Sequence, residues 1–170
     1  MSGLYSRRGV VGRRLMLVAA AVGAVMISHQ AAVGRSAGPF ASFAGNWRGS
    51  GRVLTTDGRS ERLTCRATYL VSASEESLSQ SLLCASDSYR VDIHSNIVSN
   101  GREIQGSWQE ATRNVNGGIV GTLAKRLIEG VVACPGFSAR ISVRTTGRKQ
   151  VVVIRPDGTD VASVDITMVK

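Results

Sequence analysis

The chain has few of the residues that most catalytic and metal sites require. It contains two histidines and three cysteines in 170 residues, and none of them has the H-x-x-x-H or C-x-x-C spacing of a metal site. His94 lies among polar residues, which is typical of a solvated surface histidine. The sequence therefore predicts no catalytic residues, no metal ligands and no cofactor, and hence a protein that is not an enzyme.

Long hydrophobic runs are also missing. The most apolar stretch covers residues 15–28, and these 14 residues are fewer than the about 20 that a helix needs to cross a bilayer. Four arginines between positions 7 and 14 precede it, which is the order of a signal peptide. We therefore expect a signal helix and short linker over residues 1–38, and a periplasmic or secreted protein with no permanent membrane span.

Acidic residues are outnumbered, with 12 Asp and Glu against 21 Lys and Arg, for a net charge of +9. Four of the basic residues precede the apolar run, so about +5 remains on the rest of the chain. That charge is ordinary for a soluble domain, and together with export it argues against a nucleic-acid partner. A chain of about 130 residues suits a single domain with its own core.

Proline is limited to three residues and aromatic residues to 5% of the chain, whereas glycine, serine, valine and threonine are frequent. This composition favours strands and tight turns over helices. Apolar and polar residues alternate with a period of two in nine or ten segments, which predicts strands with one wet face. The segments cover residues 47–53, 62–71, 78–85, 89–94, 103–110, 118–123, 126–133, 137–145, 150–155 and 161–169, with turns predicted at 57–58, 100–101, 116–118, 146–147 and 156–158.

Strands joined by such short turns are expected to follow one another as an antiparallel meander. No predicted helix is long enough to cover a sheet, so closure of the sheet is the way to bury one face and protect the edges. We predict an all-β fold over residues 39–170, an antiparallel up-and-down barrel of about 8–10 strands. A two-sheet β-sandwich is the alternative.

A short motif at the start of the first predicted strand carries a family resemblance. Residues 43–47 read Phe-Ala-Gly-Asn-Trp, which resembles the G-x-W opening of lipocalin-like (calycin) barrels. In that family the Trp plugs the closed end, which implies this role for Trp47, and an Arg late in the final strand packs over it. Residues 161–169 contain no Arg, and Arg155 is the nearest substitute. More broadly, the chain resembles small exported β-rich proteins of Gram-negative bacteria that have no assigned activity.

Two of the cysteines are expected to form a disulfide in an oxidising compartment. If residues 72–77 are a hairpin loop, Ala67 faces Leu82 and Cys65 faces Cys84 across adjacent strands, within bridging distance. Cys134 is left over. It is then a buried or half-buried free thiol, an intermolecular bridge or a reactive group.

Four arginines are expected to gather on the outer face of the first hairpin. With a three-residue loop at 56–58, Arg52 faces Arg62 and Arg48 faces Arg66. Like charges directly opposite in a sheet are destabilising, so such a cluster needs acidic neighbours or an anion. The sequence therefore predicts an anion-binding surface, with a solvated face as the alternative.

Two functions agree with these features. One is binding of a small apolar or amphipathic ligand inside the barrel, as the lipocalin-like resemblance implies. The other is an envelope-interaction or structural module whose outer surface meets an anionic glycan, a lipid or a protein partner. Small inward residues such as Gly49, Gly51 and Gly106 either leave a cavity or let the strands curve around a filled core. The candidate lining residues are Trp47, Tyr69, Tyr89, Trp108 and Glu110, of which both Trp are alternatively core anchors.

Overall fold

The computed structural model describes residues 37–170 of the chain. Nearly all of the predicted signal segment, residues 1–38, therefore lies outside the described residues. No helix within 37–170 is long and apolar enough to cross a membrane.

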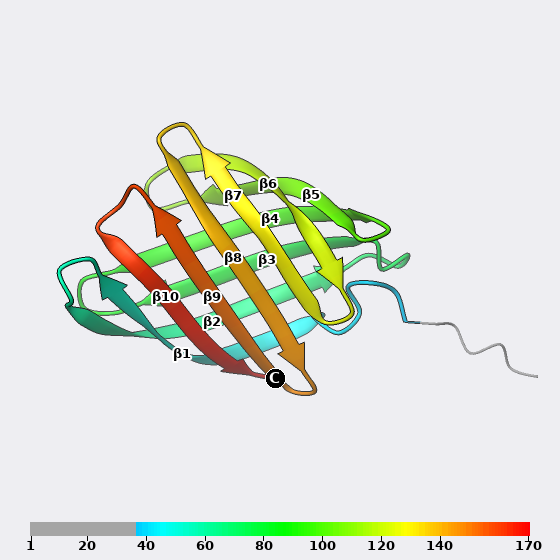
Figure 1. Ribbon diagram of the computed structural model, residues 1–170. Helices are drawn as coiled ribbons and strands as arrows, with labels where there is room; N and C mark the ends of the chain where they lie inside the picture. Colours follow the sequence, from blue (N-terminus) through cyan, green and yellow to red (C-terminus); the bar gives the residue numbers. More distant parts are fainter. Residues whose placement is uncertain (1–36) are drawn as a thin grey trace, which may run out of the picture. The chain divides into compact units, whose positions relative to one another are not determined.

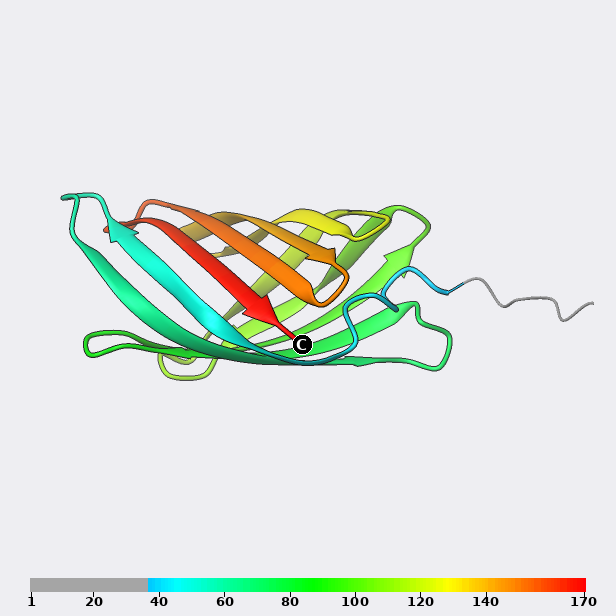
Figure 2. The same ribbon diagram turned by 90° about the horizontal axis from the view of Figure 1, so that it is seen from below.

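Ten antiparallel strands make up the described part of the chain, and each one is hydrogen-bonded to its neighbours in sequence (Figure 1). The first and last strands also pair with each other, so the sheet closes on itself (Figure 2). The predicted up-and-down barrel is thus confirmed, and the sandwich alternative is wrong. The strands are β1 (Gly45–Thr55), β2 (Ser60–Val71), β3 (Ser77–Ala85), β4 (Arg90–Asn100), β5 (Glu103–Glu110), β6 (Val115–Ala124), β7 (Leu127–Cys134), β8 (Phe137–Thr146), β9 (Lys149–Asp157) and β10 (Val161–Val169).

The predicted turn at 156–158 is displaced, because β9 runs to Asp157 and the chain bends over residues 158–160. The predicted turn at 116–118 is wrong. Residues 116–118 lie within β6, and the chain reverses over residues 111–114 instead, where Asn114 has a φ of 52°. Gly117 pairs with Trp108 of β5, and a Cβ atom at Gly117 would lie 1.9 Å from the carbonyl oxygen of Ala133. Gly117 is therefore needed for close packing inside the barrel wall, whereas a Cβ atom at Gly118 would meet no atom within 4 Å.

The inward-facing glycines let neighbouring strands approach each other closely. A Cβ atom at Gly49 would lie 2.0 Å from the carbonyl oxygen of Thr167, and one at Gly106 would lie 2.0 Å from that of Asn96. Any larger residue at these positions would push the strands apart. The structure therefore favours the second interpretation of the small inward residues, in which they allow tight strand curvature.

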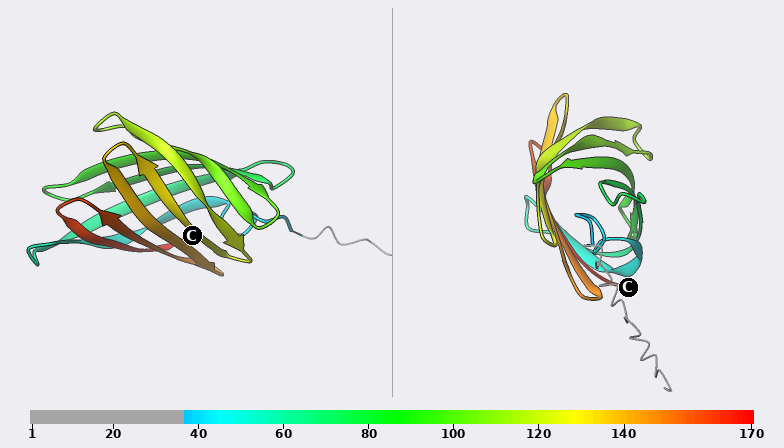
Figure 3. Two further views of the ribbon diagram at one scale, coloured as in Figure 1. Left: turned by 45° about the horizontal axis from the view of Figure 1, so that its top comes forward. Right: turned by 90° about the vertical axis from the view of Figure 1, so that its right-hand side faces the viewer.

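A short segment before β1 plugs one end of the barrel. Phe40 and Phe43 are fully buried, and Trp47 is fully buried beside them. The Trp47 indole N–H donates a 2.8 Å hydrogen bond to the carbonyl oxygen of Phe43. Figure 3 shows this segment inside the ring of strands. The segment is held from outside by Glu75, whose backbone and carboxylate oxygens accept hydrogen bonds from Phe40 and Gly38.

A lysine, and not an arginine, lies over the Trp47 ring. The Lys170 ammonium lies 5.2 Å from the centroid of the Trp47 ring, within the range of a cation–π interaction. Arg155, expected in this place, lies on the outer face and forms an ion pair with Asp165 at 3.1 Å. That expectation is wrong because side chains alternate along β9, and Arg155 falls on the outward set.

A series of buried side-chain hydrogen bonds crosses the plugged half of the barrel. The Tyr69 hydroxyl donates a 2.9 Å hydrogen bond to Oε1 of Gln150, and Nε2 of Gln150 donates one of 3.2 Å to Oγ1 of Thr145. Burial raises the pKa of Tyr69, so the hydroxyl remains a neutral donor. This series links β2 to β9 and β8 and satisfies polar groups that would otherwise be buried alone.

A disulfide joins Cys65 of β2 to Cys84 of β3. The two residues are direct partners in the register, as predicted, and Ala67 faces Leu82. Cys134 is free and half-buried.

Replacing Cys65 and Cys84 together by Ala should lower the free energy of unfolding by about 3 kcal/mol, because the disulfide closes a loop of about 20 residues. Urea unfolding followed by tryptophan fluorescence measures the loss, and Cys134→Ala is the control, since it removes a cysteine but leaves the disulfide intact. Mass spectrometry of the unreduced protein should find a 65–84 linkage. Free thiols at both positions, or a linkage of either one to Cys134, would refute the assignment.

Candidate functional site

The two ends of the barrel differ in how well their inward side chains are covered. At the plugged end, inward residues such as Leu78, Ile97 and Met168 are at most 5% exposed. At the opposite end, Val53 and Cys84 are at most 4% exposed, but nine other inward-facing apolar residues are only partly buried. We call them the open-end set: Tyr89, Ile93, Val115, Val132, Cys134, Phe137, Ile154, Val161 and Val164.

The difference follows from what covers each end. Phe40 and Phe43 fill the end where β1 begins, and within residues 37–170 no corresponding segment lies over the end where β1 finishes. Apolar side chains that face the barrel axis there are left in contact with solvent. Partly exposed apolar side chains gathered at one place are one feature of small-molecule sites.

Trp108 lies at the base of the open-end set and is 8% exposed. Its ring packs edge-on against Phe137, with 5.9 Å between the ring centroids. The indole Nε1–H is buried and has no hydrogen-bond acceptor among the described residues. A buried donor without an acceptor is costly, so this N–H is a polar feature in an otherwise apolar region.

The free thiol also belongs to this end. Cys134 is the last residue of β7 and pairs directly with Phe137, the first residue of β8. The disulfide takes the other two cysteines, so Cys134 is the one free thiol of the chain. In the described chain the Cys134 thiol is free and half-buried, and the intermolecular bridge and the reactive group stay predictions.

Glu110 is held in a network of hydrogen bonds at the β5–β6 turn. Its Oε1 accepts bonds from the backbone N–H groups of Asp92 and Thr112 and from the Thr112 hydroxyl, at 3.0, 3.1 and 2.6 Å. Its Oε2 accepts one of 2.8 Å from the N–H of Arg113. Partial burial raises the pKa of this carboxyl, but the hydrogen bonds outweigh it and lower the pKa to about 2. The carboxylate thus organises the turn.

The five lining residues predicted from the sequence do not come together. Trp47 and Tyr69 are buried in the plugged half, whereas Tyr89 and Trp108 lie in the open half and Glu110 lies in its turn. Their role in ligand binding stays a prediction. In the structure Val132 and Ile154 face the core, but no sequence signal says which end of the barrel is covered.

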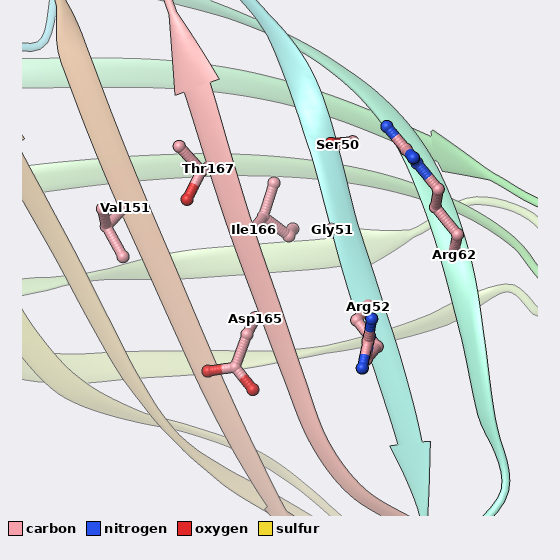
Figure 4. A pocket seen from close by; sticks show the side chains of 8 residues that line it. All are labelled: Ser50, Gly51, Arg52, Arg62, Val151, Asp165, Ile166 and Thr167. Carbon is pink, nitrogen blue, oxygen red and sulfur yellow. The ribbon is translucent and has the colours of Figure 1, made fainter.

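On the outer face, the predicted arginine register is confirmed. Arg48 faces Arg66, Ser50 faces Thr64, and Arg52 faces Arg62. An open hollow of about 400 Å³ lies beside these residues, over β2, β1, β10 and β9 (Figure 4). It is lined by Ser50, Gly51, Arg52, Arg62, Val151, Asp165, Ile166 and Thr167.

No cluster of three or more His, Cys, Asp or Glu side chains within residues 37–170 has the geometry of a metal site. His94, the histidine in this range, lies on the outer face of β4, and its Nε2 is 3.2 Å from Asp92.

No family model and no curated protein matches the sequence. Solved structures do match the fold. Rv2717c from M. tuberculosis is 12% identical with a TM-score of 0.59, over 77% of this chain and 94% of that chain. The S-type phycobiliprotein lyase CPES from Guillardia theta is 12% identical with a TM-score of 0.52, over 77% of this chain and 89% of that chain.

These similarities show that the fold is shared with solved structures, but they do not support the expected link to exported Gram-negative proteins. They also correct one expectation. The prediction that the protein is not an enzyme is contradicted by the second similarity, because a lyase is an enzyme and its barrel has the same fold. The absence of catalytic motifs from the sequence was not sufficient ground for that prediction.

Replacing Glu110 by Gln should make the protein less stable at pH 7. It should also make the free energy of unfolding depend less on pH in the acid range. The folded-state pKa lies below the ordinary value of 4.5, so the carboxylate stabilises the fold above pH 4.5, and this stability is lost as the pH falls towards 2. Between pH 4.5 and 2, the free energy of unfolding of the wild type should fall by up to about 3 kcal/mol more than that of the variant. Urea unfolding at several pH values measures this difference in the free energy of unfolding. Glu103→Gln, on the same strand, is the control. Parallel pH profiles for wild type and Glu110→Gln would contradict this role.

Proposed function

We propose that the protein binds a small apolar or amphipathic molecule at the open end of the barrel. The observation that carries the proposal is the contrast between the two ends, one plugged by Phe40, Phe43 and Trp47 and the other leaving the open-end set only partly buried. Covering these side chains with an apolar ligand would remove apolar surface from water, at about 25 cal/mol per Å². The lipocalin-like fold supports the proposal, because an internal ligand is what that resemblance implies.

The ligand is amphipathic in this proposal. The open-end set is almost entirely apolar, yet the Trp108 N–H next to it lacks an acceptor. A carboxylate, carbonyl or ether oxygen on the ligand would accept this hydrogen bond. A molecule with an apolar body and one or two acceptor atoms therefore fits the residues better than a pure hydrocarbon.

We also propose that the protein is exported to the periplasm or beyond, with residues 1–38 as signal and linker and residues 39–170 as the mature domain. The charge order of the N-terminal segment supports this location. The Cys65–Cys84 disulfide supports it as well, since such bonds persist mainly in oxidising compartments.

Val132 and Val131 offer a matched pair of variants for the ligand site. Val132 points inward at the open end, whereas Val131 points outward and is 40% exposed. Val132→Trp should lower the affinity for alkyl carboxylates at least tenfold, because the larger ring fills the site, while Val131→Trp should change it less than twofold. Isothermal titration with carboxylates of eight to sixteen carbons measures both, and thermal unfolding verifies that the variants fold.

The same titration tests the polar contact through Trp108→Phe, which keeps an aromatic ring against Phe137 but removes the N–H. Loss of one hydrogen bond should weaken carboxylate binding about three- to tenfold. Equal effects of the two valine variants would overturn the proposed site, as would a wild type that binds none of the carboxylates.

A further inference from the structure

Four exposed arginines form a compact group on the outer face of β1 and β2. We call Arg48, Arg52, Arg62 and Arg66 the arginine cluster; all four side chains are exposed. Arg48 is the direct cross-strand partner of Arg66, and Arg52 is the direct partner of Arg62. Cross-strand partners have Cβ atoms about 5 Å apart, so each pair places two positive charges side by side.

The protein supplies little negative charge to balance the cluster. On the flanking strands, β3 contains no charged residue and β10 contains one, Asp165. Asp165 faces Arg52 in the register, but its carboxylate oxygens lie 3.1 and 3.3 Å from the guanidinium of Arg155 and 3.0 Å from the Ser163 hydroxyl. No arginine of the cluster has a carboxylate within 4.0 Å among residues 37–170.

The arrangement is elongated along the strands. The two arginine pairs are separated by four residues along β1, which corresponds to about 13 Å at the usual rise of a strand. Ser50 and Thr64 lie between them as a third facing pair. A ligand that meets both pairs must therefore carry its negative charges along a chain.

The hollow beside the cluster adds hydrogen-bonding groups to the charges. Arg52 and Arg62 line it together with Ser50, Thr167 and the Asp165 carboxylate (Figure 4). Its volume of about 400 Å³ is open to solvent. Hydroxyl and carboxylate groups at this position can exchange hydrogen bonds with the hydroxyls of a sugar ring, while guanidinium groups pair with carboxylates.

We propose that the arginine cluster and the adjoining hollow bind a linear acidic polysaccharide, a chain of sugars bearing carboxylate groups. The spacing of the pairs fits charges repeated along a polymer, and the hollow over β1 and β10, which combines polar groups with Val151 and Ile166, fits the polar edge and apolar face of a sugar ring. The aromatic residues within 37–170 are all in the barrel core or packed against it, so this face offers no stacking platform for the bases of a single-stranded nucleic acid. This site is separate from the open end.

The test uses polygalacturonate and its hexamer and dimer, with binding measured by titration calorimetry in increasing NaCl. Wild type should bind the polymer with an affinity that falls as salt rises. The hexamer should bind at least tenfold tighter than the dimer, because it is long enough to reach both arginine pairs. Arg48→Gln with Arg66→Gln should remove this length dependence, and Arg52→Gln with Arg62→Gln should lower the affinity for either oligomer at least tenfold.

Arg102→Gln with Arg126→Gln is the matched control, since it removes the same charge from two exposed turn residues away from the cluster. It should change the affinity less than twofold. The proposal is overturned if this control weakens binding as much as the cluster variants do, or if methyl-esterified polygalacturonate binds as well as the acid form. It is also overturned if single-stranded DNA or phosphatidylglycerol vesicles bind as tightly as polygalacturonate, or if polygalacturonate does not bind.

Discussion

The hydrogen bonds between β1 and β10 turn a meander of ten strands into a closed barrel, and the other features depend on that closure. Closure leaves no strand edge exposed and forces the sheet to curve strongly. Inward glycines such as Gly49 and Gly106 permit this curvature, because their neighbours' carbonyl oxygens occupy the space of a Cβ atom. With the wall closed, the two ends become the routes into the interior, and the Phe40–Phe43 segment fills one of them.

Much of this architecture could be predicted from the sequence, because strand alternation and tight turns are local signals. The partners Cys65–Cys84 and Arg52–Arg62 followed from counting residues across two hairpins. The predictions failed where a residue has two common uses. Gly117 was assigned to a turn, although it serves close packing beside Trp108. The covered and uncovered ends depend on where residues 38–44 fold back, which no periodicity reveals.

The period of two in a strand also separates the two proposed sites. Val131 and Val132 are adjacent in β7, yet one faces solvent outside the barrel and the other faces the open end. In the same way, the arginines of β1 and β2 alternate with Trp47, Leu63 and Cys65, which belong to the core. An apolar interior and a basic outer face can therefore occupy the same strands and be changed independently.

The central claim is that ligands enter at the end opposite the plug. The most direct measurement is methyl NMR of protein labelled at Val, Ile, Leu and Met, titrated with dodecanoate. The account predicts the largest shifts at Val132, Ile154 and Val164, with Leu78 and Met168 of the plugged end unchanged. Largest shifts at the outward Val98 and Val120, or at the plugged end, would contradict it, and so would a spectrum that does not change.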